Sequence, residues 1–320
     1  MDDEEYYRKI KRINKENLYK QIRKKKSDIW KNFEVTGTLN KKEKIHEKIH
    51  DTVTALAESD ATGETAKIFS EIRSTMKIPM LTSIWRILAD SFDDLDLSWK
   101  AVKPLYKTGQ PEAALNRLHK DASFPNLKPI SLDEIEKIGI SNKDLINIKA
   151  ILKAYNRSNS LNLLTQSALV TDESKKYVPY PIVKICHKSI SIPRLLPREE
   201  ISDLVWEEIL KINKFGTNIP NPGIATIFRH LAYWPKLLSL MQTQLQIAQK
   251  NGDISIGANS VSKIAIEEGN RMMQLRDENA INKMSSYARS TIIQYVNGPF
   301  KCARIVNIGT ALYNWLEKAK

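Results

Sequence analysis

Two histidines near the N-terminus have the spacing of a zinc site. His46 and His50 stand four residues apart with Glu47 between them. On a helix this spacing places both imidazoles on one face, where Glu47 could act as a general base toward a zinc-bound water. The same spacing also follows from a four-residue repeat, because Glu-Lys-Ile-His occurs twice in succession over residues 43–50. A solvated, lysine-rich helical face explains the motif more simply, so we predict no metal.

The other reactive side chains are isolated in the sequence. His119, His187 and His230 each stand alone, and Cys186 and Cys302 lie in dissimilar contexts. Two such cysteines indicate free thiols in a reducing cytoplasm and not a disulfide framework. The chain has neither a glycine-rich phosphate loop nor a serine-centred nucleophile elbow.

Length and charge restrict the function classes. A chain of 320 residues with 42% hydrophobic residues is long enough for two packed domains. No apolar run approaches the roughly 18 residues that a membrane span requires, so no membrane partner is expected. The net charge is +13, and the segment Arg8–Lys31 holds eleven Lys or Arg against two acids. Such an arm could contact nucleic acid; a solvated helix that packs on the body is the simpler alternative.

One apolar segment occurs twice and defines the elements that must position any site. Ile219–Lys236 and Ile78–Asp90 match without a gap at an offset of 143 positions. Pro79 matches Pro222, and the Ile-Trp-Arg run at Ile84 matches the Ile-Phe-Arg run at Ile227. This regularity predicts two copies of one unit. Copies related by a pseudo-two-fold axis would form a cleft where they meet.

The periodicity of apolar residues predicts an all-α protein. Ser131 with Glu134, and Ser141 with Asp144, are capping-box signatures that open two helices. The polar run 156–159 predicts a break, with helix again over 161–169. The predicted organisation is a charged helical extension (1–51), a first helical repeat (52–170), a proline-rich irregular linker (171–196) and a second helical repeat (197–320).

Taken in order, these segments resemble the D,L-2-haloacid dehalogenases of the DehI type, which share the AhpD-like helical fold. The resemblance covers residues 60–320. It rests on four pieces of sequence: Gly63–Ile72, Pro79–Ala89, Ala154–Leu164 and Phe228–Lys236. It implies two helical repeats with an active site between them, a plausible homodimer, and hydrolytic, cofactor-free release of halide from short 2-haloalkanoic acids.

The resemblance also implies roles for particular residues. In the family, an aspartate takes a proton from the water that attacks the halogen-bearing carbon, and an asparagine helps to hold that water. The asparagine falls on Asn159, for which a local turn asparagine is the alternative. The aspartate falls on Ile227, which cannot take a proton, and residues 209–252 contain no Asp or Glu. The candidate substrate-binding residues are Met80, Ser83, Thr226 and Ile227.

Three interpretations of the missing base remain open. His230, three residues after Ile227, could serve as a substitute base, although a half-exposed helix residue is the simpler view. An acid from elsewhere, such as Glu71, Asp90 or Glu208, could enter the cleft. Alternatively, the protein binds a small carboxylic acid or apolar ligand without turnover, with Arg86 and Arg229 as anion partners or as structural residues.

Overall fold

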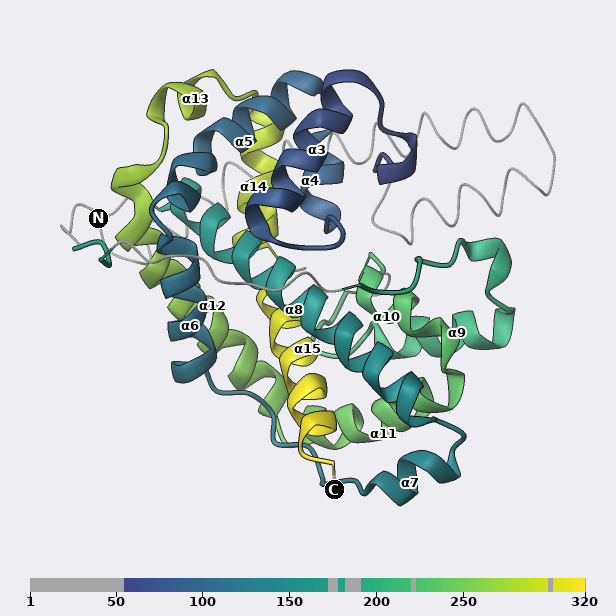
Figure 1. Ribbon diagram of the computed structural model, residues 1–320. Helices are drawn as coiled ribbons and strands as arrows, with labels where there is room; N and C mark the ends of the chain where they lie inside the picture. Colours follow the sequence, from purple (N-terminus) through teal and green to yellow (C-terminus); the bar gives the residue numbers. More distant parts are fainter. Residues whose placement is uncertain (1–54, 172–177, 182–190, 220–222, 299–301, 320) are drawn as a thin grey trace. The chain divides into compact units, whose positions relative to one another are not determined.

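The computed structural model describes residues 55–171, 178–181, 191–219, 223–298 and 302–319. Every described residue belongs to one compact unit, residues 50–320. The described residues form helices and contain no strand (Figure 1), which confirms the predicted all-α class. The α-helices are α3 (Gly63–Met76), α4 (Ser83–Leu88), α5 (Phe92–Lys107), α6 (Gln110–Asp121), α7 (Leu132–Lys137), α8 (Asn142–Val170), α9 (Asp203–Ile212), α10 (Thr226–His230), α11 (Pro235–Lys250), α12 (Asp253–Met272), α13 (Glu278–Lys283), α14 (Ser286–Asn297) and α15 (Cys302–Glu317). Short 3-10 turns are η1 (Glu58–Asp60), η2 (Arg198–Glu200), η3 (Leu231–Tyr233) and η4 (Met273–Leu275).

Both predicted capping boxes are present. The Ser131 hydroxyl accepts from the backbone N–H of Glu134 at the start of α7, and the Glu134 carboxylate accepts in return from the Ser131 N–H. Ser141 and Asp144 make the same reciprocal pair at the start of α8. Each box satisfies two backbone donors that the first helical turn would otherwise leave unpaired.

The predicted break at residues 156–159 is wrong, because α8 runs without interruption from Asn142 to Val170. Four successive polar residues suggest a solvated bend when the sequence is read locally. In the fold, α8 is packed on all sides over residues 154–168, so polar and apolar side chains there are buried alike. A helix satisfies its own backbone groups in such surroundings, whereas a buried bend would leave some unpaired.

Helices α8, α12 and α15 form the centre of the described fold (Figure 1), and a glycine lies at each of their three mutual contacts. A Cβ on Gly269 of α12 would lie 2.7 Å from the backbone of Ser167 in α8. A Cβ on Gly257 of α12 would overlap Asn307 of α15, and one on Gly309 of α15 would overlap Asn156 of α8. The three helices therefore approach more closely than residues with side chains would allow.

Two hydrophobic cores lie on either side of this centre, and each draws on both halves of the chain. The first contains α3 to α6, the C-terminal half of α8, much of α12, and α13, α14 and the start of α15. The second contains α7, the N-terminal half of α8, α9 to α11 and the rest of α15. Neither half of the chain could therefore bury its apolar face alone.

Several features recur at the predicted offset of 143 residues. Gly109 and Gly252 both precede a helix in the left-handed conformation, with φ of 71° and 82°. Arg86 donates from Nε to the carbonyl of Leu56, and Arg229 donates from Nε to the carbonyl of Leu196, each at 2.8–2.9 Å. These matches are what an internal repeat predicts, although the exact repeat boundaries remain a prediction.

Candidate active site

The middle of α8 presents an unusual number of buried polar side chains. Asn156, Ser158 and Ser160 are all buried. Each has a side-chain oxygen without a hydrogen-bond partner within the protein. Buried polar groups are normally paired. These unpaired side chains, on the helix between the two cores, make the middle of α8 the candidate site.

Asn156 lies next to Ile227 at this point. A Cβ on Gly309 would overlap Asn156 Oδ1 and would lie 3.3 Å from Cδ1 of Ile227. The bare Cα of Gly309 therefore lets α15 approach an amide of α8 and an apolar side chain of α10 at one place. Ile227 is only 1% exposed and belongs to the second core. The position predicted for the base thus holds an alkyl group beside an unpaired amide oxygen.

His230, on the same short helix as Ile227, is buried and bonded through both ring nitrogens. Its Nε2 lies 2.8 Å from the carbonyl of Pro193, and its Nδ1 lies 3.2 Å from the hydroxyl of Tyr155. A carbonyl can only accept, so Nε2 carries the proton and Nδ1 accepts from Tyr155. Burial lowers the pKa of His230, while the bond to Pro193 opposes that shift. The simpler view of His230 as half-exposed is therefore wrong, since only 2% of it is exposed.

The other predicted site residues lie in different environments within the fold. Asn159 is buried one turn beyond Asn156, and its backbone carbonyl accepts from the Cys302 thiol at 3.6 Å. Met80 is partly buried and packs against the second core. Ser83 and Thr226 are the first residues of α4 and α10, and both are half-buried. None of these contacts reaches Asn156, so the site roles of the four residues remain predictions.

Buried carboxylates are engaged elsewhere in the described part of the chain. Asp94 and Glu268 are the acids buried there. Asp94 of α5 accepts from the Ser285 hydroxyl at 2.8 Å. Glu268 of α12 accepts from Arg117 and from the Tyr180 hydroxyl. Glu71, an alternative acid considered from the sequence, accepts from Trp99 and Lys103. The contacts of these three acids therefore assign none of them to the Asn156 site.

Arg86 and Arg229 have structural contacts. The Nε of Arg86 donates to the backbone carbonyl of Leu56, and the Nε of Arg229 donates to the backbone carbonyl of Leu196. Arginine at these positions ties an irregular segment to a short helix, so the structural alternative explains both residues without an anion.

Some sequence predictions fall outside the described residues. His46 and His50, the basic segment Arg8–Lys31, and Cys186 with His187 are all in this group. Where the chain is described, no three His, Cys, Asp or Glu side chains come together as a metal site. Within the same residues, no helix is both long and apolar enough to cross a membrane. Dimer formation and nucleic-acid binding also remain predictions.

Sequence reasoning did not single out Asn156, Tyr155 or Gly309. Asn156 belongs to the same polar run as Asn159, and spacing alone does not show which amide meets Ile227. One usable signal was present: Gly309 interrupts an otherwise apolar helical pattern, and a glycine inside a helix often marks a close approach.

The described residues define an all-α structural class, and solved structures have a similar fold. A complex of a D-2-haloacid dehalogenase mutant with D-2-CPA matches with a TM-score of 0.66 and 15% identity, over 83% of this chain and 95% of the other. A complex of D-2-haloacid dehalogenase with L-LA matches with a TM-score of 0.68 and 16% identity, over 82% of this chain and 95% of the other.

Sequence comparison identifies the same group. A configuration-inverting 2-haloacid dehalogenase from Alcaligenes xylosoxydans xylosoxydans is 24% identical over 201 residues, which are 59% of this chain and 67% of that protein. No family model matches the chain. Sequence and fold together confirm the predicted relationship to the 2-haloacid dehalogenase family.

Proposed function

We propose that the protein binds a small carboxylic acid beside Asn156 and lacks the aspartate-dependent hydrolysis of its relatives. The observation that carries this proposal is the meeting of Ile227 with Asn156 Oδ1 at Gly309. Hydrolysis by the family mechanism needs a carboxylate at the position of Ile227 to take a proton from water. A buried alkyl group cannot do so, and a water held by the amide oxygen alone would not be activated.

The unpaired amide oxygen favours one kind of ligand. Asn156 Oδ1 is an acceptor, so it selects a group that donates a hydrogen bond. The 2-hydroxyl of a short 2-hydroxy acid can donate, whereas the halogen of a 2-haloacid cannot. The apolar side chain of Ile227 suits the alkyl part of the same molecule. We therefore expect tighter binding of 2-hydroxypropionate than of 2-chloropropionate.

Thermal unfolding with each acid tests this proposal. A ligand at about 100 times its Kd stabilises the folded state by about 2.7 kcal/mol. We expect 2-hydroxypropionate to raise the Tm of the wild-type protein and to have no effect on Asn156→Leu. Asn259→Leu, at an exposed position of α12, is the control and should respond like the wild type. Equal Tm shifts in the Asn156 variant, or a flat response of the wild type to both acids, would contradict the proposal.

One observation favours a second candidate, dehalogenation with a different base. The Tyr155 hydroxyl donates to Nδ1 of His230 one residue before Asn156. In this alternative, an attacking water would give its proton to the Tyr155 oxygen while Tyr155 passes its own proton to His230, and the halide would leave the substrate. Halide release from 2-chloropropionate that disappears in Tyr155→Phe would support it. No halide from the wild type over about pH 6 to 10, around the ordinary pKa values of His and Tyr, would exclude it.

A further inference from the structure

Residues 191–197, here called the cover segment, lie against α10 and η3 through their backbone carbonyls. Pro193 accepts from His230 Nε2, and Leu196 accepts from Arg229 Nε, each at 2.8 Å. Arg194 accepts from the Tyr233 hydroxyl, also at 2.8 Å. All three donors are side chains and all three acceptors are main-chain oxygens. Ile192 and Leu196 of the segment also pack, partly buried, against the second core, so backbone bonds and these two side chains together hold the cover segment.

One imidazole connects the cover segment to α8. His230 bonds to Pro193 of the cover segment through Nε2 and to Tyr155 of α8 through Nδ1. Tyr155 immediately precedes Asn156 in the sequence. Displacement of the cover segment would thus expose the outer edge of His230, which lies on the same short helix as Ile227.

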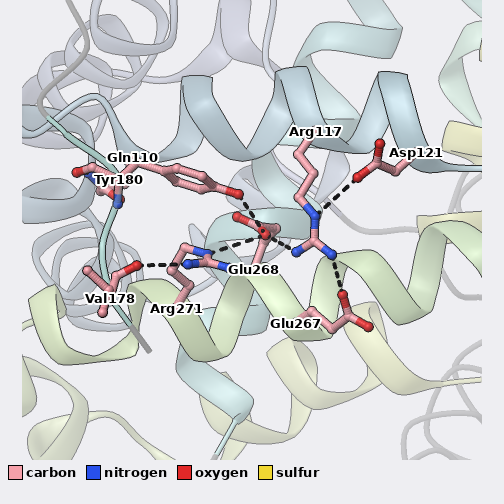
Figure 2. Close-up of polar contacts among 8 residues, drawn as sticks. All are labelled: Gln110, Arg117, Asp121, Val178, Tyr180, Glu267, Glu268 and Arg271. Carbon is pink, nitrogen blue, oxygen red and sulfur yellow. Dashed lines mark hydrogen bonds and ion pairs between the residues drawn. The ribbon is translucent and has the colours of Figure 1, made fainter. Parts of the chain in front are cut away.

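A second described piece of the linker, residues 178–181, is attached at another place (Figure 2). The side-chain amide of Gln110 pairs with both backbone groups of Tyr180: it donates to the carbonyl at 2.7 Å and accepts from the N–H at 2.8 Å. Arg271 donates to the carbonyl of Val178 at 2.8 Å, and its guanidinium lies 4.7 Å from the centre of the Tyr180 ring.

Buried charge strengthens this second attachment. The Tyr180 hydroxyl donates to Glu268 at 3.1 Å, and the same carboxylate pairs with Arg117 of α6 (Figure 2). Glu268 is fully buried, and Gln110 is 1% exposed. Release of Tyr180 would leave the Gln110 amide without partners inside the protein, which is costly for a buried polar group.

The two attachments therefore differ in what their release requires. Of the donors that hold the cover segment, Tyr233 is 37% exposed and Arg229 is half-buried, so water can replace their lost bonds. His230 is the buried member. The Tyr180 attachment rests on Gln110 and Glu268, which water does not reach. The cover segment is thus the end that opens more readily.

We propose that the cover segment opens as a local unit over the Asn156 site while the Tyr180 attachment stays closed. This opening admits the ligand of the proposed function, and in that respect the inference rests on the proposed function. Local openings of this kind occur below the free energy of global unfolding where backbone bonds are few and partners are exposed.

Native-state proteolysis without ligand tests the opening directly. Arg194 is a trypsin site within the cover segment, and its side chain is 63% exposed. Cleavage there requires the backbone around Arg194 to leave α10 and η3 and enter the protease, so its rate follows the population of the open form when closing is fast. Tyr233→Phe removes one bond to the cover segment, and we expect cleavage after Arg194 about fivefold faster, as for the loss of one ordinary hydrogen bond.

Two matched variants control this experiment. Tyr287→Phe makes the same chemical change at an exposed tyrosine that bonds to Asp90, and Arg86→Met alters the arginine that corresponds to Arg229. Neither should change cleavage after Arg194. Equal rates in Tyr233→Phe and wild type, or cleavage that follows global unfolding in denaturant, would overturn the proposal. If the proposed function is right, saturating 2-hydroxypropionate should slow cleavage after Arg194. If Tyr233→Phe is cleaved faster but 2-hydroxypropionate does not change the rate, the opening is supported and the proposed ligand is rejected.

Discussion

The side chains of Asn156 and Ile227 meet at the bare Cα of Gly309, although the three residues come from α8, α10 and α15. One contributes an unpaired amide oxygen and the second an alkyl group, while the glycine leaves the room that both occupy. In a relative of the 2-haloacid dehalogenases, this arrangement retains a polar contact for a ligand and lacks the carboxylate that would activate water.

Replacement of Ile227 by aspartate should introduce the missing chemistry. Ile227→Asp places a carboxylate beside Asn156, where it can take a proton from a water that also donates to the amide oxygen. We expect halide release from 2-chloropropionate by this variant, measured as free chloride. Asparagine has nearly the same size and polarity as aspartate but cannot act as the base. The Ile227→Asn variant should therefore release no chloride. If the Ile227→Asp protein folds but releases no chloride at any pH from about 6 to 10, this expectation is contradicted.

A methyl group at Gly309 should destabilise the fold through Asn156. Gly309→Ala should cost about 1–3 kcal/mol of unfolding free energy, as overpacking of a tight core usually does. Because the added Cβ would overlap Asn156 Oδ1, the cost should be smaller in an Asn156→Ala background. Urea unfolding of the two single variants and the double variant measures this coupling, expected at about 0.5–3 kcal/mol for residues in contact. Additive effects would show that the two side chains do not interact.

Two neighbouring glutamates of α12, Glu267 and Glu268, should contribute differently to the free energy of unfolding. Glu268 is fully buried and paired with Arg117, whereas the Glu267 side chain, paired with the same arginine at 2.6 Å, is 32% exposed. Glu268→Leu leaves a charge without its buried partner and should cost about 3 kcal/mol. Glu267→Leu should cost less than about 1 kcal/mol, as for exposed ion pairs. Chemical denaturation of both variants makes the comparison, and equal losses would be inconsistent with the burial of Glu268.

A buried histidine should make the protein less stable in mild acid. Burial lowers the pKa of His230 below the ordinary value near 6.5. The unfolded state then binds more protons than the folded state as the pH falls through the unfolded pKa, so stability present above that pH is lost below it. Urea midpoints at pH 7.5 and pH 5 should show the decrease, and His230→Gln should make it smaller. An unchanged pH dependence in that variant would rule out His230 as a contributor.

The sequence by itself determined most of the helices and the relationship to the dehalogenases. Capping residues such as Ser131 and Ser141 act on neighbours three positions away, so their effect is visible locally. The absence of an acid from residues 209–252 is likewise a fact of sequence, and it removes the expected base from this segment however the chain folds.

Only the tertiary structure decided what surrounds each side chain at the candidate site. His230 is bonded to Pro193, 37 residues away, and Gly309 lies against Asn156 on another helix. Contacts of this length depend on how helices cross, which local periodicity does not encode. The same reason explains α8. Read locally, its polar run resembles a solvated bend. In the fold, neighbours from both halves of the chain bury this run, and a continuous helix pairs its backbone groups there.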